Sequence, residues 1–270
     1  MSATITRNFA GKPGETSKMP GHWVLAHLGK RILRPGGREL TRRMLDALEV
    51  NHCDRVIEFA PGLGETARYL LDKTRAEYTG IEQDAHAAEW LSQRFDGTRA
   101  RFIHGSAAQT ELPSDCASVL WGEAMLSMQP ASQKEQIVRE AARLLGTGGR
   151  YAIHELCLGP DGLSAEARQE IQNELSRNIH VGVRPLNSGE WRSLLASCGF
   201  EVVTELHAPM HLLELKRMIS DEGFIGTVKI LWNMFREAGA RERVLGMRRL
   251  FRKYSRNLTA ICIVARKIQP

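Results

Sequence analysis

The segment VIEFAPGLGETARYL, residues 56–70, passes from a short apolar strand through a glycine turn into a helix. This strand–turn–helix unit is the first of several in the chain, and helical segments stand between most of the later strands. Strands are predicted at residues 55–60, 77–83, 101–106, 116–125, 150–158, 200–208 and 258–268. Alternating strands and helices favour right-handed crossovers and a parallel sheet that is covered on both faces. The sequence therefore predicts an α/β fold.

Helical segments before, between and after these strands define the expected domain organisation. Residues 22–33 and 38–50 carry apolar side chains at helical spacing, and residues 132–145 form an amphipathic helix. Residues 1–20 predict a flexible arm, and residues 21–270 predict a single domain without a linker. That domain is expected to contain a helical cap at 21–50, a core at 51–158, a helical cover at 159–198, and the last two strands in 199–270 with a helical insertion at 210–257.

Finer features are predicted for the helical parts. Ser188 reads as the N-cap of a helix that ends at Ser197, and Gly223 and Gly239 interrupt the insertion. The tryptophans at positions 90 and 232 read as core residues. The apolar side chains of the insertion are expected to close the core, in preference to capping a substrate pocket: Phe224, Ile225, Val228, Leu231, Trp232 and Phe235.

The composition, 43% hydrophobic and 25% charged, is that of a globular protein. No apolar run is long enough to span a bilayer and the N-terminus shows no secretory signal, so a cytoplasmic location is expected. Five dispersed cysteines without a CxxC pair predict reduced thiols and no metal site. The net charge of +6 permits a nucleic-acid or anionic-lipid partner without requiring one, although basic residues concentrate between 236 and 256.

The glycine turn GLGETA, residues 62–67, matches the G-x-G-x-x-G/A fingerprint of dinucleotide-binding folds. In that interpretation a pyrophosphate lies against the helix N-terminus, held by backbone N–H groups and the helix dipole. Glu58 closes the preceding strand, however, and its carboxylate suits a cationic ligand better. S-adenosylmethionine, which carries an ammonium and a sulfonium and no phosphate, is such a ligand. Glu82 ends the second strand and is expected to bind ribose hydroxyls in either case.

Four motifs, in order, resemble those of the class I S-adenosylmethionine-dependent methyltransferases, in particular the small-molecule branch related to ubiquinone- and menaquinone-pathway methyltransferases. The motifs are EFAPGLG at 58–64, GIEQD at 80–84, IHGSAAQTELP at 103–113 and ARLLGTGGRYAIHE at 142–155. The resemblance covers about residues 55–156 and extends faintly to 200. It implies a Rossmann-like, mostly parallel seven-stranded sheet whose last strand is antiparallel. Residues 258–268 would then lie between the fifth and sixth strands.

The resemblance also implies which residues bind the cofactor. Ala60 stands where the family has the first glycine of its turn, which is tolerable if Ala60 keeps a negative φ. Ser106 stands where the family usually has Asp and would hydrogen-bond the adenine amino group more weakly. The complete set is Glu58, Ala60, Gly62, Gly64, Glu82, Gln83, Ser106, Ala107 and Gly122. The expected product is S-adenosylhomocysteine.

Methyl transfer from a sulfonium needs a nucleophile placed in line with the S–CH3 bond, and a general base only if the nucleophile carries a proton. The candidate catalytic residues are Glu123 and His154, near the carboxyl ends of strands, and His180 in the helical cover. A hydrogen-bonded strand residue is the favoured alternative for His154, and His180 is balanced between surface loop and pocket lining. Three basic residues of the cap could reach a carboxylate, although a solvated face is favoured for them: Lys30, Arg34 and Arg38.

We therefore expect methyl transfer to a small-molecule acceptor. The sequence determines neither the identity of this acceptor nor the atom that is methylated, and a homodimer is possible. An RNA methyltransferase that uses the basic helix at 236–256 is an alternative. Against it, WGEAM stands where an acid/Asn-Pro-Pro-aromatic motif would follow the fourth strand. A nicotinamide-dependent oxidoreductase and a non-catalytic cofactor-binding protein are further alternatives.

Overall fold

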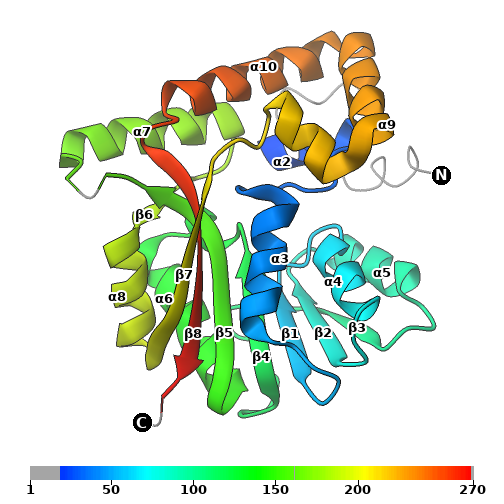
Figure 1. Cartoon of the computed structure of the whole chain (residues 1–270), viewed down its shortest axis with the longest axis vertical. Helices are drawn as coiled ribbons and strands as arrows, with labels where there is room; N and C mark the ends of the chain where they lie inside the picture. The colour runs from blue at the N-terminus through cyan, green and yellow to red at the C-terminus, as the bar shows by residue number, and fades with distance from the viewer. Residues whose placement is uncertain (1–18, 161, 269–270) are drawn as a thin grey trace.

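The computed structural model describes residues 19–160 and 162–268, which form a mixed sheet with helices on both faces. The strands are β1 (Arg55–Phe59), β2 (Glu77–Glu82), β3 (Ala100–His104), β4 (Ala117–Glu123), β5 (Leu145–Leu158), β6 (Leu186–Asn187), β7 (Phe200–Pro209) and β8 (Leu258–Lys267). The seven longer strands follow the order β3-β2-β1-β4-β5-β8-β7, and the two-residue β6 pairs with β5 (Figure 1).

The direction of the strands confirms the predicted topology. β1 to β5 pair in parallel, whereas β8 is antiparallel to both of its neighbours, β5 and β7. The last strand in the chain therefore lies between the fifth and sixth long strands. Its residues from Ala260 to Ala265 are buried, as the run of β-branched and other apolar side chains predicts.

Two helical layers cover the sheet. α3 (Gly37–Leu48), α4 (Glu65–Leu71) and α5 (Ala85–Arg94) pack on one face, and α6 (Ala131–Leu144) and α8 (Ser188–Ser197) pack on the other. Leu40 and Leu91 contribute to the first core, and Ile137 and Trp191 to the second. Asp84 caps α5, because its side chain accepts a hydrogen bond from the Ala87 N–H.

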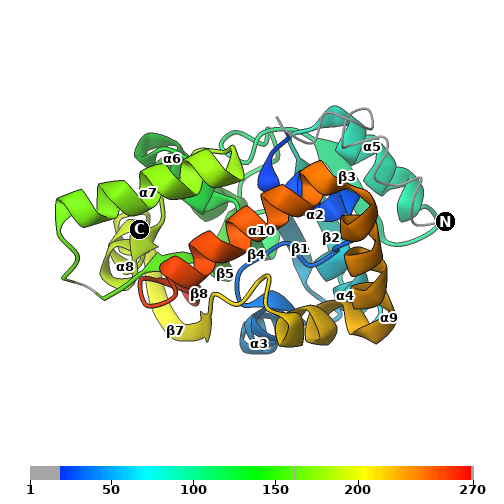
Figure 2. The same cartoon turned by 90° about the horizontal axis from the view of Figure 1, so that it is seen from above.

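Four further helices form a cap at the edge where the parallel strands end (Figure 1; Figure 2). They are α2 (Gly21–His27), α7 (Ala165–Ile179), α9 (Leu215–Arg236) and α10 (Ala238–Lys253). Val24, Leu175, Ile230 and Met247 meet in a separate apolar cluster within this cap. In residues 19–160 and 162–268 no helix has both the length and the hydropathy needed to cross a bilayer.

Some predicted helix boundaries were wrong. The first helix ends at His27 instead of residue 33, because Gly29 has a φ of 101° and the chain then runs irregularly to Gly37. Asn187, and not Ser188, caps α8: its side chain accepts from the Glu190 N–H in a capping box. Residues 146–149 belong to an irregular start of β5, and the break between α9 and α10 falls at residue 237.

The outer surface of the insertion differs most from the prediction. Trp232 is 59% exposed and is not a core residue, whereas Trp90 is half-buried and packs against the core on the α3, α4 and α5 side. The other apolar side chains that were expected to close the core are exposed as well, at 45% or more: Phe224, Ile225, Val228, Leu231 and Phe235. The break at Gly223 is confirmed, with φ 76° and ψ 170° inside α9. The predicted flexible arm at residues 1–20 lies, for residues 1–18, outside the described residues.

Candidate active site

A cavity of about 300 Å³ lies between the cap and the carboxyl ends of β1, β2 and β4. Each of these strands ends near the cavity with an acidic residue that lines it: Glu58, Glu82 and Glu123. The cap contributes His22, Trp23, Arg31, Leu33 and Arg34 to the opposite side. The carboxyl ends of parallel strands are the usual position for ligands in open α/β sheets.

The glycine turn forms the floor of this cavity. Ala60 has a φ of +53°, so the condition of a negative φ is not met, and an alanine occupies the left-handed region that favours glycine. A hydrogen bond from the Ala60 N–H to the Ile81 carbonyl holds it there. A Cβ added at Gly62 would meet only the Ala60 carbonyl oxygen, at 4.0 Å, so a ligand can approach the backbone closely at this point.

Two glycines of the predicted cofactor set do not line a cavity. A Cβ at Gly64 would lie 2.7 Å from the Phe95 ring, so this glycine is needed for packing of α4 against α5. Gly122 is buried in β4, and an added Cβ there would meet Met125 at 3.3 Å. Gly64 and Gly122 therefore allow close packing next to the glycine turn and at the end of β4.

Glu82 lies at the junction of two cavities. A second hollow, of about 360 Å³, extends from Glu82 and Gln83 past Ser106 and Ala107 toward α6. Ser106 sits in a tight turn, where its hydroxyl accepts a hydrogen bond from the Ala108 N–H. One oxygen of Glu82 accepts from the Asp84 N–H, and partial burial raises the pKa of this carboxyl. Five residues line both cavities: Ala60, Glu82, Gln83, Met125 and Gln129.

Glu58 is almost fully buried at the end of β1. Its carboxylate accepts a hydrogen bond from the Tyr78 hydroxyl at 2.5 Å. Burial, and secondarily the negative charge of Glu123, raise the pKa of Glu58 to about 8, although the Tyr78 hydroxyl and Arg34 act in the opposite direction. A cation bound next to Glu58 would favour its ionised form.

Glu123 forms the centre of a hydrogen-bonded network. It accepts hydrogen bonds from the Thr41 and Thr66 hydroxyls, both at 2.6 Å, and pairs with Arg34 Nε at 2.6 Å. Burial alone would raise the pKa of Glu123, but Arg34 and the hydrogen bonds of His154 and Thr41 outweigh it and hold the value at about 2. These contacts fix the Glu123 carboxylate. They also connect four parts of the chain beside the cavity: the segment between α2 and α3, α3 itself, α4 and β5.

The other two candidate catalytic residues do not line a described cavity. His154 is fully buried, and its ring nitrogens contact Glu123 and the Pro35 carbonyl, so its role here is to hold that network. His180 is exposed at the C-cap of α7, with a φ of 57°. Neither histidine is placed where it could remove a proton from an acceptor in the cavity.

His22, near the start of α2, was not identified from the sequence. It lines the large cavity and also a smaller apolar hollow of about 60 Å³, which lies between α2, α7, α10 and the 124–128 segment. Its Nδ1 atom is buried and has no hydrogen-bond partner among residues 19–160 and 162–268. Burial lowers the pKa of His22 to about 4, so the ring is neutral at pH 7.

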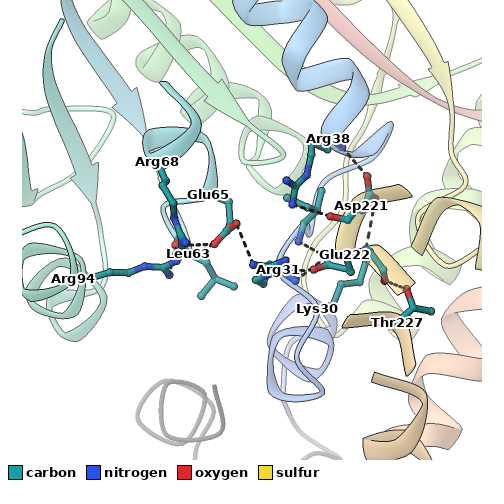
Figure 3. Close-up of polar contacts among 12 residues, drawn as sticks. Lys30, Arg31, Arg38, Leu63, Glu65, Arg68, Arg94, Asp221, Glu222 and Thr227 are labelled. Carbon is teal, nitrogen blue, oxygen red and sulfur yellow. Dashed lines mark hydrogen bonds and ion pairs between the residues drawn. The ribbon is translucent and has the colours of Figure 1, made fainter. Parts of the chain in front are cut away.

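The cap is fastened by a buried charged cluster (Figure 3). Lys30 Nζ lies 3.7 Å from Asp221 and 3.6 Å from Glu222, and all three side chains are buried. The Arg38 N–H donates to Asp221, and Arg31 Nε lies 3.2 Å from Glu222. Of the three basic cap residues considered from the sequence, only Arg34 lines the cavity; Lys30 and Arg38 face α9.

Arg31 also connects the cap to the glycine turn. Its guanidinium lies 4.0 Å from Glu65, the first residue of α4 (Figure 3). Glu65 is paired in addition with Arg68 at 2.8 Å and Arg94 at 2.9 Å. Because Arg31 is half-exposed and lines the cavity, it stands at the entrance between the cap and the core.

Comparison with known sequences places this arrangement in a family. Residues 56–149 match the model of a methyltransferase domain. An uncharacterized protein of Haemophilus influenzae is 30% identical over 92% of this chain and 98% of its own length. The 27-O-demethylrifamycin SV methyltransferase of Amycolatopsis mediterranei is 26% identical over 60% of this chain and 59% of its own.

A solved structure shows the same fold. Phosphoethanolamine N-methyltransferase 2 of Haemonchus contortus, in complex with S-adenosyl-L-methionine, superposes with a TM-score of 0.69. The match covers 98% of this chain and 60% of that one, at 16% identity. The match to a methyltransferase domain does not favour the oxidoreductase alternative. The chain belongs to the class I S-adenosylmethionine-dependent methyltransferases.

Proposed function

We propose that the enzyme methylates a hydroxyl or amine group on a small, largely apolar acceptor. The observation that carries this proposal is the position of His22, which lines both the cofactor cavity and the apolar hollow and whose Nδ1 atom has no hydrogen-bond partner among the described residues. Leucine, isoleucine, methionine and phenylalanine side chains of the cap line much of this hollow. An acceptor with an apolar body would fit this lining, with its nucleophilic atom directed toward His22.

The residues around the two larger cavities match the parts of S-adenosylmethionine. Glu82, at their junction, would bind the ribose hydroxyls, and the hollow along Ser106, Ala107 and Gln129 would take the adenine. Glu58 would lie near the ammonium group of the methionyl part, above the open backbone at Gly62. The bound cofactor supplies an activated methyl group on a sulfonium, so the protein has mainly to position the acceptor and exclude water.

In this scheme His22 accepts a hydrogen bond from the acceptor and takes its proton as the new bond to the methyl carbon forms. A neutral imidazole can do this, and the low pKa of His22 keeps the ring neutral at physiological pH. Trp23, whose ring centroid lies 5.2 Å from that of His22, helps to keep water out. Glu123 is a positioning residue, because four side chains already occupy its oxygens.

Two further observations favour a small molecule over RNA. The rifamycin relative is named for methylating a 27-O-demethyl compound, which is a small-molecule oxygen acceptor. In addition, several basic residues of α10 are already paired: Arg248 and Arg252 with Glu214, and Lys253 with Glu174. The relation to ubiquinone- and menaquinone-pathway enzymes stays a prediction, as do the cytoplasmic location and the homodimer.

Binding and transfer assays would test the proposal in two steps. S-adenosylhomocysteine at about 100 times its Kd should stabilise the folded protein by about 2.7 kcal/mol, and NAD should not. Radiolabelled methyl groups from S-adenosylmethionine should then reach apolar alcohols, phenols or amines in preference to total RNA. Stabilisation by NAD alone would contradict the cofactor assignment, and labelling of RNA alone would contradict the acceptor class.

A further inference from the structure

Helix α9 presents an apolar face to the outside of the cap. Of the eleven large apolar side chains that are exposed in the described part of the chain, eight lie on this one helix. Ile225 is 84% exposed, and Phe224 and Phe235 are each 71% exposed. The face is made up of Leu215, Ile219, Phe224, Ile225, Val228, Leu231, Trp232 and Phe235. A large contiguous apolar patch on the surface of a globular domain is typical of an interaction site.

The spacing of these residues makes the patch continuous. Phe224, Val228, Leu231 and Phe235 follow one another at intervals of four, three and four residues, so they form one row along the helix. With Ile225 and Trp232 beside that row, the apolar side chains after Gly223 span roughly 120° of the helix circumference. The rings of Trp232 and Phe235 stack at 6.1 Å, which flattens the outer surface.

The opposite face of α9 is firmly attached. Asp221 and Glu222 enter the buried cluster with Lys30, and the Asn233 side chain donates to the Leu28 carbonyl. Ile230 is 1% exposed within the cap core. The outward orientation of the apolar row is therefore imposed by contacts on the inner face.

The charged side chains around the apolar row indicate the kind of surface that it fits. The two acidic residues of α9 are both buried, whereas Lys216, Lys229 and Arg236 are exposed. Lys229 and Arg236 lie directly beside the apolar row, on the side of Ile225 and Trp232, at the position that a 3.6-residue repeat gives them. A helix with phenylalanine and tryptophan on one face and lysine and arginine beside it has the composition of helices that lie in the interface of anionic membranes.

Two other occupants fit this surface less well. In a two-fold symmetric dimer that joins one α9 face to another, the basic rims of both copies would be brought together without acidic partners on the same helix. Residues 1–18 of the same chain contain few large apolar side chains, and their basic residues outnumber their single acidic one. Neither a second α9 face nor residues 1–18 would supply the negative charge that Lys229 and Arg236 beside the apolar row require.

We propose that the outer face of α9 binds reversibly to the surface of an anionic lipid bilayer and holds the cap against it. The apolar row would enter the boundary between headgroups and acyl chains, and Lys216, Lys229 and Arg236 would contact lipid phosphates. The proposal does not depend on the acceptor assigned above, because it rests on the outside of the cap alone.

Vesicle co-sedimentation of the full-length protein tests this proposal. Vesicles of phosphatidylcholine with roughly one third phosphatidylglycerol should bind the protein, and vesicles of phosphatidylcholine alone should bind it about tenfold more weakly. Replacing Phe224, Trp232 and Phe235 together by alanine should reduce binding at least about tenfold. Val203→Ala, at a 58% exposed apolar position on the edge strand β7, is the matched control and should bind like the wild type.

Charge and fluorescence measurements complete the test. Lys229→Gln should weaken binding to the anionic vesicles roughly fivefold and have little effect with neutral ones. A blue shift of tryptophan emission on addition of anionic vesicles should disappear in Trp232→Phe. Thermal unfolding and S-adenosylhomocysteine binding, unchanged in all variants, would show that they are folded.

Three results would overturn the proposal. One is the absence of binding to either kind of vesicle. Another is binding that the triple alanine variant leaves unchanged. The third is a wild-type mass in solution of two chains that falls to one chain in the triple variant without any loss of vesicle binding, which would identify the face as a subunit interface.

Discussion

The sheet half of the molecule and the cap half handle charge in opposite ways. Around β1, β2 and β4 the acidic side chains end the strands and line an open cavity, with Glu82 partly exposed between two hollows. In the cap, Asp221 and Glu222 are turned inward and pair with Lys30, and Glu222 also pairs with Arg31, while apolar side chains face outward. The core thus keeps one carboxylate, that of Glu82, available for a ligand, and the cap uses its charges for attachment.

The largest effect is expected from breaking that attachment. Lys30→Met would leave Asp221 and Glu222 buried without their lysine partner and should lower the free energy of unfolding by about 3–5 kcal/mol. Lys216→Met, at an exposed position of α9, the helix that carries Asp221 and Glu222, should change the free energy of unfolding by less than about 0.5 kcal/mol. Urea unfolding measures both variants. A loss of under about 1 kcal/mol in Lys30→Met would mean that Arg31 and Arg38 neutralise the cluster without it.

The next prediction concerns the cap residue that faces the cavity. His22→Ala should reduce kcat/KM roughly 100-fold or more, corresponding to about 2.7 kcal/mol, because it removes the proposed proton acceptor. The Kd for S-adenosylhomocysteine should change by less than about threefold. His180→Ala is the matched control and should retain full activity, since His180 is exposed away from the described cavities. Equal activity of His22→Ala and wild type would refute the assignment.

On the core side, Glu82→Ala should weaken binding of S-adenosylhomocysteine at least about tenfold, or about 1.4 kcal/mol, through loss of the ribose contacts. Glu77→Ala, at the exposed opposite end of the same strand, should leave the Kd unchanged. Isothermal titration calorimetry gives both values. If Glu82→Ala binds as tightly as wild type, the ribose lies elsewhere.

The smallest effect concerns pH. The folded pKa of Glu58, about 8, is above its ordinary value of 4.5, so the native state retains a proton that the unfolded chain has released. This contribution to stability is present at low pH and is lost as pH rises toward 8. Glu58→Gln, which stays neutral, should therefore gain stability relative to wild type as pH rises from 5 to 8. A constant difference across this range would show that Glu58 is ionised throughout.

The same contrast explains how far the sequence could be interpreted. In the core, strand periodicity and the EFAPGLG and GIEQD motifs located the strands, the turn and Glu82 correctly, because local backbone geometry determines them. The negative φ that would have made Ala60 tolerable is not found, since the turn imposes a glycine-like conformation whatever residue is present. Gly64 and Gly122 stay predictions as cofactor-binding residues, although an added Cβ at either would meet a packed side chain.

The cap was predicted poorly for a different reason. Its helices come from four separated stretches, and an apolar row at helical spacing does not indicate which side of a helix is buried. The row from Phe224 to Phe235 was therefore assigned to the core, although the burial of Asp221 and Glu222 turns it outward. His22 carries no motif, and only the meeting of α2 with the cavity gives it a role.

The fastening of the cap by Lys30, Asp221 and Glu222 has a consequence for how the enzyme selects its acceptor. Opening the cap would break the hydrogen bonds of Asp221 with the Arg38 backbone N–H and guanidinium, and a buried group that loses its partner is unfavourable, which makes wide opening costly. Discrimination then depends on a hollow whose shape is set before the acceptor arrives. A hollow with a fixed shape discriminates acceptors by size. One extra methylene group changes the discrimination free energy by about 1–3 kcal/mol.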